Sequence, residues 1–115
     1  MNVAIYHNPR CSKSRATLQL LKDRGIDPDI IEYLKNPPNA EELDEILRLL
    51  GMEPHDLMRK QEAPYRENGL DDKSLDRETL IKAMVEHPIL IERPIVKASG
   101  KAAIGRPPES VLAIL

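Results

Sequence analysis

A single cysteine, Cys11, lies in a basic stretch near the start of this 115-residue chain. The stretch reads YHNPRCSKSR, and Arg10, Lys13 and Arg15 place positive charge around the thiol. Nearby cations and a position at a helix N-terminus lower a thiol pKa from about 8.5 into a range of roughly 3.5–7.5. Because the thiolate is the reactive form, the stretch predicts a cysteine nucleophile.

Two further side chains of the stretch, His7 and Ser14, have groups that can help to keep the sulfur charged. We expect His7 to act as a charge partner where the loop folds back, and Ser14 to donate its hydroxyl. A helix N-terminus with nearby cations also binds anions. The loop therefore predicts a pocket that holds a tetrahedral oxyanion over the thiolate. A cysteine that merely fills the core is the alternative, which the polar neighbours of Cys11 make less suitable.

The elements that must position this loop follow from the residues around it. Residues 3–6 favour a strand, Asn8-Pro9 breaks it, and residues 12–24 favour a helix that ends at Gly25. Residues 30–34 favour a second strand, and a strand-helix-strand unit of this size predicts parallel strands. Cys11 then lies at the start of the helix. The apolar residues at helical spacing in that helix are Ala16, Leu18, Leu20 and Leu21.

The middle of the chain is predicted to be helical. Asn39, followed three residues later by Glu42, is typical of a capping box, and Gly51 closes the first helix. A helical turn is expected at residues 56–60, and a loop with a helical turn at residues 61–75. A further helix is expected from Asp76 to about residue 86, where His87-Pro88 ends it.

The last part of the chain predicts a β-hairpin and a helix. Residues 95–97 and 102–104 are the two strands, with Ser99-Gly100 at the turn, and Pro107 begins the helix. The whole order predicts an α/β fold with a thioredoxin-like core, β-α-β then β-β-α, carrying a helical insertion. We expect one domain over residues 1–115.

Composition excludes several classes of protein. The net charge of −2, together with the absence of Phe and Trp, gives no basis for nucleic-acid binding. No apolar run approaches the roughly 18 residues that span a membrane, and the N-terminus lacks a signal-peptide pattern. One cysteine rules out an internal disulfide and a cysteine-based zinc site. We therefore expect a cytoplasmic protein, monomeric, with no metal and no bound cofactor.

The single thiol also limits redox chemistry. Ser14 stands where a Cys-x-x-Cys motif carries its second cysteine, and no other thiol exists in the chain. Any adduct on Cys11 must therefore be cleared by a thiol of another molecule. Glutathione, as co-substrate, and a glutaredoxin are the expected reductants.

Several motifs occur together in an order that resembles a known family. His7-Asn8-Pro9, Cys11, Ser14 and Arg15 are similar to the H-N-P-x-C-x-x-S-R loop of the ArsC-type, glutaredoxin-coupled arsenate reductases. The similarity continues over nearly the whole chain through Tyr33-Leu34, Pro37-Pro38, Leu57-Met58-Arg59-Lys60, His87-Pro88-Ile89-Leu90-Ile91, Arg93-Pro94-Ile95-Val96 and Gly105-Arg106-Pro107.

The resemblance implies reduction of arsenate to arsenite on a thioredoxin-like fold. It implies that Cys11 attacks arsenic(V), that glutathione adds to the adduct, and that glutaredoxin removes it. Family positions that bind the oxyanion match Arg59, Arg93 and Arg106, and Arg15 of the loop is assigned with them. By the same resemblance His7 and Ser14 keep the thiolate charged, and the Arg93-Pro94 bond is expected to be cis.

A departure from the family pattern at the Cys11 loop and two alternatives accompany this interpretation. Arg10 and Lys13 flank Cys11 where family members tend to carry small or neutral residues, so these charges can alter anion binding. The first alternative is a glutathione-dependent thiol oxidoreductase that acts on another substrate. The second is an Spx-like transcriptional regulator, although Ser14 removes the second sulfur of the usual Spx disulfide switch.

Overall fold

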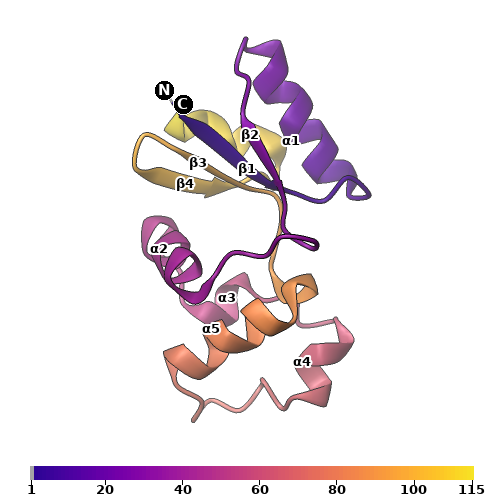
Figure 1. Ribbon diagram of the computed structural model, residues 1–115, viewed down its shortest axis with the longest axis vertical. Coiled ribbons are helices and arrows are strands. Elements are labelled where there is room, and N and C mark those ends of the chain that lie inside the picture. Colours follow the sequence, from indigo (N-terminus) through magenta and orange to yellow (C-terminus); the bar gives the residue numbers. More distant parts are fainter. Residues whose placement is uncertain (1) are drawn as a thin grey trace. The chain divides into compact units, whose positions relative to one another are not determined.

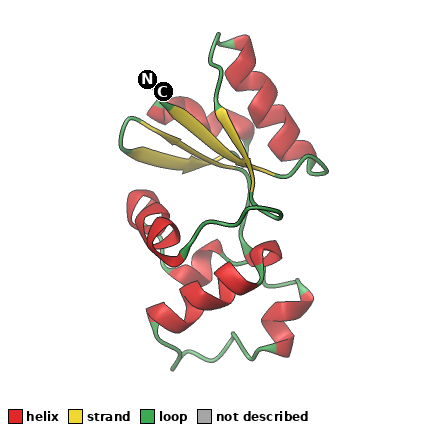
Figure 2. Cartoon of the chain, in the orientation of Figure 1, coloured by secondary structure: helices red, strands yellow, loops and turns green. Residues whose placement is uncertain are grey.

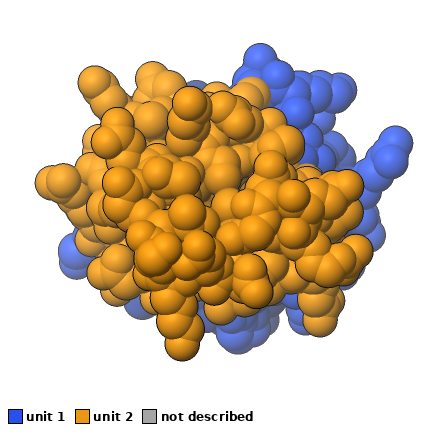
Figure 3. Space-filling model, turned by 90° about the horizontal axis from the view of Figure 1, so that it is seen from below, with its two compact units in different colours: residues 1–36, 93–115 blue, residues 37–92 orange. Residues whose placement is uncertain are grey.

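The computed structural model describes residues 2–115, which form two compact units. One unit joins the chain up to Asn36 with Arg93–Leu115, and the other spans Pro37–Glu92 (Figure 3). The chain thus leaves the first unit and later returns to it, as a helical insertion into an α/β core requires. That residues 1–115 act as a single domain stays a prediction.

Within residues 2–115, the first unit contains a four-stranded sheet with the order β2-β1-β3-β4 (Figures 1 and 2). β1 and β2 are parallel and are joined by the helix α1, whereas β1–β3 and β3–β4 are antiparallel. A 3₁₀ helix, η2, ends the unit. The predicted order of elements is confirmed. The bounds are β1 Val3–His7, α1 Ser12–Asp23, β2 Asp29–Glu32, β3 Ile95–Ala98, β4 Lys101–Ile104 and η2 Pro108–Ile114.

The core of this unit lies where α1 and η2 pack on the sheet and on each other. Its buried members are Val3, Ile5, Leu21, Val96, Ala98 and Val111. The residues that α1 buries are only in part the apolar residues that occur at helical spacing in its sequence. Ser14, Thr17 and Leu21 are buried, whereas Ala16 is exposed. The two hydroxyl residues can be buried because both are hydrogen-bonded inside the unit.

Two boundaries in this unit differ from the sequence expectation. β2 ends at Glu32, because the carbonyl of Glu32 accepts the N–H groups of Lys35 and Asn36 and forms a turn. The last helix begins at Pro108 and is of the 3₁₀ type. The predicted hairpin turn is present, with Ser99 and Gly100 at φ of 53° and 71°. Positive φ at both turn residues suits the twist of a two-residue hairpin.

The second unit is helical. Its elements are α2 (Ala40–Leu50), α3 (Pro54–Leu57), α4 (Ala63–Glu67), α5 (Arg77–Glu86) and the 3₁₀ helix η1 (Pro88–Leu90). The helical turn expected at residues 56–60 lies two residues earlier, because Pro54 suits a first helical turn and Met58 instead forms a β-bridge with Ile91.

The predicted helix ends of this unit are confirmed. The side chain of Asn39 accepts the Glu42 N–H at 2.8 Å, and that of Asp76 accepts the Thr79 N–H at 2.8 Å. Gly51 ends α2 in the left-handed conformation, with φ of 67°. The apolar faces of α2 and α5 meet and bury Leu43, Ile46, Leu47, Leu80, Ile81 and Met84.

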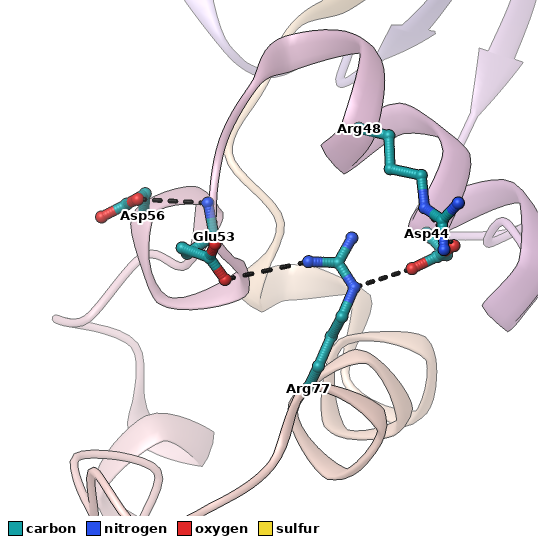
Figure 4. A network of polar contacts seen from close by, with 5 residues as sticks. All are labelled: Asp44, Arg48, Glu53, Asp56 and Arg77. Atoms are coloured by element: carbon teal, nitrogen blue, oxygen red, sulfur yellow. Dashed lines mark hydrogen bonds and ion pairs between the residues drawn. The ribbon is translucent and has the colours of Figure 1, made fainter.

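A network of charged side chains joins three helices of this unit (Figure 4). Arg77, at the start of α5, contacts Asp44 of α2 at 2.8 Å and Glu53, before α3, at 3.8 Å. Arg48 approaches the other oxygen of Asp44 at 2.9 Å. The hydrogen bond from Arg77 lowers the pKa of Asp44. Because these groups lie at the surface, the network orients the helices more than it stabilises them.

Within residues 2–115, every helix is too short or too polar to cross a lipid bilayer.

Candidate active site

The loop after β1 places Cys11 at the N-terminus of α1, as the sequence predicts. The Asn8 carbonyl accepts the Cys11 N–H at 3.0 Å, and the Asn8 side chain accepts the Arg10 N–H at 3.0 Å. Cys11 is the N-cap residue in extended conformation, and its carbonyl accepts the Arg15 N–H at 3.0 Å. These local hydrogen bonds fold residues 8–11 into a tight turn and direct the first N–H groups of α1 toward the sulfur.

The surroundings of Cys11 favour its thiolate. The residue is only 9% exposed, and burial by itself would raise the thiol pKa. The backbone N–H of Ser14, the charge of Arg93, the N–H of Lys13 and the charge of Arg106 act in the opposite direction. Together they outweigh burial, so that the pKa of Cys11 is lowered from its ordinary value. The sulfur is therefore prepared for nucleophilic attack.

Two of the predicted arginines lie beside the sulfur, and the strand register explains why. Tyr6 of β1 pairs with Ile95, and Ile95 pairs with Ile104. Arg93, before β3, and Arg106, after β4, therefore emerge at the same end of the sheet as the Cys11 loop. Arg106 Nη1 lies 3.9 Å from Cys11 Sγ and donates to the Arg93 carbonyl at 3.3 Å.

Both of these arginines precede a cis proline. The Arg93–Pro94 bond is cis, as the resemblance led us to expect, and the Arg106–Pro107 bond is cis as well. Nothing in the sequence distinguished the second bond from an ordinary trans bond, since most X-Pro bonds are trans.

His7 and Ser14 contact each other rather than acting separately. His7 Nδ1 lies 2.6 Å from Ser14 Oγ, which also accepts the Asn8 N–H at 3.0 Å. Burial lowers the pKa of His7, with Arg15 and Lys22 acting in the same direction and Glu32 opposing them. The neutral imidazole is thus favoured at pH 7. The pair fixes the loop, and the backbone N–H of Ser14 acts on the sulfur.

Arg15 holds the same loop from outside. Its Nη1 donates to the Pro9 carbonyl at 3.0 Å, and the side chain is exposed. Its assignment to anion binding stays a prediction, and so do the catalytic roles of His7 and Ser14.

Thr17 and Gly105 form a contact that sequence reasoning did not identify. Thr17 is fully buried, and its hydroxyl lies 2.8 Å from the Lys13 carbonyl and 3.4 Å from the Gly105 carbonyl. A Cβ on Gly105 would overlap Thr17 Oγ1 and come within 2.8 Å of Pro94 Cγ. Only glycine allows this approach, which brings the start of the Arg106 segment against α1. A glycine directly before a predicted site arginine was the signal in the sequence.

Arg59 belongs to the second unit, where its partners are acidic. Its guanidinium lies 3.1 Å from Glu62 and 3.9 Å from Glu92, and its N–H donates to the Leu90 carbonyl at 2.7 Å. These contacts hold Arg59 in a defined position within its own unit. Its predicted part in anion binding stays a prediction.

A cluster of side chains that could bind a metal ion is absent from the part of the chain that the structure describes. Among residues 2–115, no group of three or more His, Cys, Asp and Glu side chains gathers closely enough to hold an ion. The chemistry offered by the first unit is that of an activated thiolate next to guanidinium groups.

Comparison with known proteins agrees with this arrangement. The family model for the ArsC family matches residues 6–114. The chain belongs to the ArsC family. The predicted resemblance is thereby confirmed, and the α/β architecture is the thioredoxin-like fold of ArsC structures.

Three relatives match over nearly the whole length of both chains. The uncharacterized protein YfgD of Escherichia coli is 56% identical over 114 residues, covering 98% of this chain and 96% of YfgD. A Neisseria meningitidis serogroup B protein named arsenate reductase is 49% identical over 114 residues, covering 98% of this chain and 97% of the relative. The solved structure named arsenate reductase from Vibrio cholerae is 52% identical with a TM-score of 0.97, covering 100% of this chain and 98% of that one.

Proposed function

We propose that this protein reduces arsenate to arsenite, with Cys11 as the nucleophile. The observation that carries the proposal is the sulfur of Cys11 at the N-terminus of α1, with Arg106 Nη1 at 3.9 Å. A thiolate next to guanidinium groups suits attack on the central atom of a tetrahedral oxyanion, because the cations also hold its oxygens. ArsC relatives that are named arsenate reductases support this choice of anion.

The first two steps build a thiol adduct on arsenic. The Cys11 thiolate attacks arsenic(V), a sulfur–arsenic bond forms, and one oxygen leaves as water after it takes up protons. The thiol of glutathione then forms a second sulfur–arsenic bond and displaces another oxygen as water. Arsenic stays in the +5 state through both steps.

The reduction takes place when a glutaredoxin thiolate attacks the sulfur of the bound glutathione. A disulfide forms between glutaredoxin and glutathione, and the electron pair of the broken sulfur–arsenic bond stays on arsenic, which becomes arsenic(III). Water then cleaves the bond to Cys11 and releases arsenite and the thiol. The sum consumes one glutathione and one glutaredoxin thiol per arsenate.

An external reductant follows from the single cysteine of the chain. Since no second thiol can form an internal disulfide, both electrons must come from other molecules. Glutathione as co-substrate and glutaredoxin as partner are the reductants that we propose. We further propose that the protein acts as a cytoplasmic monomer.

Arg93 and Arg106 are the proposed oxyanion ligands of the first unit, with Arg59 and Arg15 completing the set. Guanidinium groups that meet charge as it develops on a reacting anion contribute several kcal/mol in a site that excludes water. Arg93 and Arg106 have a second effect, since both lower the pKa of the Cys11 thiol.

A coupled assay tests the proposal. Arsenate-dependent oxidation of NADPH is followed in the presence of glutathione, glutaredoxin and glutathione reductase, for the wild type and for Cys11→Ser. We expect turnover that disappears in Cys11→Ser and when glutathione or glutaredoxin is left out. A wild type without turnover would contradict arsenate reduction, and turnover that survives Cys11→Ser would contradict the nucleophile.

A further inference from the structure

The first unit contains a hollow between the carboxyl ends of its two parallel strands. It has a volume of about 290 Å³ and is lined by residues 7–10 on one side and by Glu32, Leu34 and Lys35 on the other. We call it the β1–β2 hollow. The outer side of the carboxyl ends of parallel strands is where α/β proteins commonly bind small ligands. The volume lies near the lower end of the range for small-molecule pockets, about 300–1,000 Å³.

The charged groups of the β1–β2 hollow are arranged as two cations and one anion. Arg10 and Lys35 supply the cations and Glu32 the anion. Lys35 Nζ lies 3.8 Å from Glu32 Oε1, with both side chains well exposed. A surface pair of this kind contributes about 0–1 kcal/mol, so either partner can turn to a ligand at little cost.

An apolar side chain completes the lining. Leu34 is 44% exposed, which makes it one of three large apolar residues described as exposed in residues 2–115. It follows β2 directly and lies on the hollow next to the charged groups. The ligand that this surface fits is small, carries two negative charges and one positive charge, and has an apolar or methylene portion.

We infer that the β1–β2 hollow binds glutathione, the thiol co-substrate. The tripeptide carries two carboxylates, which match Arg10 and Lys35, and one ammonium group, which matches Glu32. Its methylene groups match Leu34. The inference rests on the proposed function, in which glutathione adds to an adduct on Cys11.

The position of the hollow suits this step. Arg10 lines the hollow and directly precedes Cys11, and His7 of the lining contacts Ser14 in the first turn of α1. A thiol held beside the residue that carries the adduct reacts at a high effective concentration. Arg93 and Arg106, by contrast, reach the sulfur from the segments next to β3 and β4. The oxyanion and the thiol co-substrate are therefore held by different groups.

Binding measured without arsenate tests the inference separately from the proposed function. Cys11→Ser, which cannot form a covalent adduct, is titrated with S-methylglutathione by calorimetry. Arg10→Gln and Lys35→Gln are added singly on this background, with Arg24→Gln, an exposed cation of the same unit outside the hollow, as the matched control. We expect a roughly fivefold or larger increase in Kd for each hollow variant, because each loses a contact to a charged group, and no change for Arg24→Gln.

A second ligand tests the predicted place of the ammonium group. The analogue of S-methylglutathione without its α-amino group should bind Cys11→Ser more weakly than S-methylglutathione does. On the Glu32→Gln background this difference should disappear. Equal discrimination in both backgrounds would overturn the assignment of Glu32.

Two outcomes would overturn the inference as a whole. The first is that S-methylglutathione does not bind to Cys11→Ser, or that its Kd is the same with and without Arg10→Gln and Lys35→Gln on this background. The second is measured on the active enzyme, which keeps Cys11. It is that Arg10→Gln and Lys35→Gln raise KM for arsenate and leave KM for glutathione unchanged. A wild type that binds S-methylglutathione in the hollow yet does not reduce arsenate would contradict the proposed function alone.

Discussion

At the scale of single residues, the reactivity of Cys11 results from opposing effects on one sulfur. Burial disfavours the thiolate, whereas two backbone N–H groups and two arginines favour it and prevail. The N–H groups are local to the loop, and the arginines are distant in the sequence. This division means that the local and long-range contributions can be separated by substitution.

Removal of Arg106 should raise the pKa of Cys11. Alkylation by iodoacetamide follows the thiolate fraction, so its rate rises with pH and is half-maximal at the thiol pKa. In the wild type this midpoint should lie below that of an ordinary cysteine, about 8.5. In Arg106→Gln it should move upward, since the mutation removes a nearby positive charge that favours the thiolate.

The matched control for this experiment is Lys101→Gln, an exposed cation at the start of β4. Its midpoint should equal that of the wild type. If Arg106→Gln also keeps the wild-type midpoint, the guanidinium does not stabilise the thiolate and serves at most as an anion ligand.

Removal of the Ser14 hydroxyl should destabilise the protein. Ser14→Ala deletes the acceptor of the Asn8 N–H and the partner of His7 Nδ1, which leaves buried polar groups without hydrogen bonds. The expected loss is about 1–3 kcal/mol in the free energy of unfolding, measured by urea denaturation. Ser12→Ala is the control, because Ser12 is an exposed serine in the same first turn of α1. This substitution should change the free energy of unfolding little. Equal effects for the two serines would contradict a structural role for the His7–Ser14 pair.

At the scale of elements, the site depends on how closely the end of β4 approaches α1. Gly105 follows β4 and donates its N–H to the Pro94 carbonyl at 2.9 Å, while its missing side chain leaves room for Thr17. The segment that carries Arg106 is thus held against the helix whose N-terminus carries Cys11. Thr17 and Gly105 position Arg106 without contacting the sulfur themselves.

A side chain at position 105 should therefore disturb the site. Gly105→Ala is expected to cost about 1–3 kcal/mol in stability, as overpacking usually does, and to raise the alkylation midpoint of Cys11. In a double-mutant cycle, Thr17→Ala should relieve part of this cost, because it removes the atoms nearest the new Cβ. The free energies of unfolding are measured by urea denaturation. If the double variant loses the sum of the two single losses, the side chain at position 105 and Thr17 do not interact.

At the scale of the whole molecule, the chain combines an α/β unit that contains Cys11 with an inserted helical unit that contains Arg59. The helical unit has its own buried apolar residues on α2 and α5 and its own network around Arg77. The prediction of one domain over residues 1–115 requires the two units to unfold together.

Hydrogen exchange of a destabilised variant tests this requirement. Leu47→Ala removes a fully buried side chain of α2 and should cost about 2–5 kcal/mol. In a single domain, the slowest amides of β1 should lose as much protection as those of α5. Loss of protection confined to the helical unit would contradict the single domain.

The sequence by itself determined the features that depend on neighbouring residues. The strand-to-helix turn at Cys11 is set by Asn8-Pro9 and the first residues of the helix, and its hydrogen bonds are all local. The helix ends at Asn39, Gly51 and Asp76 are set in the same way. The need for an external thiol follows from composition alone. These features could be predicted because their causes lie within a few residues.

The tertiary structure alone decided which distant groups reach the sulfur. Arg106 is 95 residues from Cys11, and Gly105 is 88 residues from Thr17. Surface cations have no periodicity, so the residues by themselves offered many equivalent candidates over residues 59–106, and only the family resemblance singled out Arg59, Arg93 and Arg106. The pairing of β1 with β3 and of β3 with β4 is what places Arg93 and Arg106 at one end of the sheet. The burial of Ser14 and Thr17 likewise depends on partners that only the folded chain supplies.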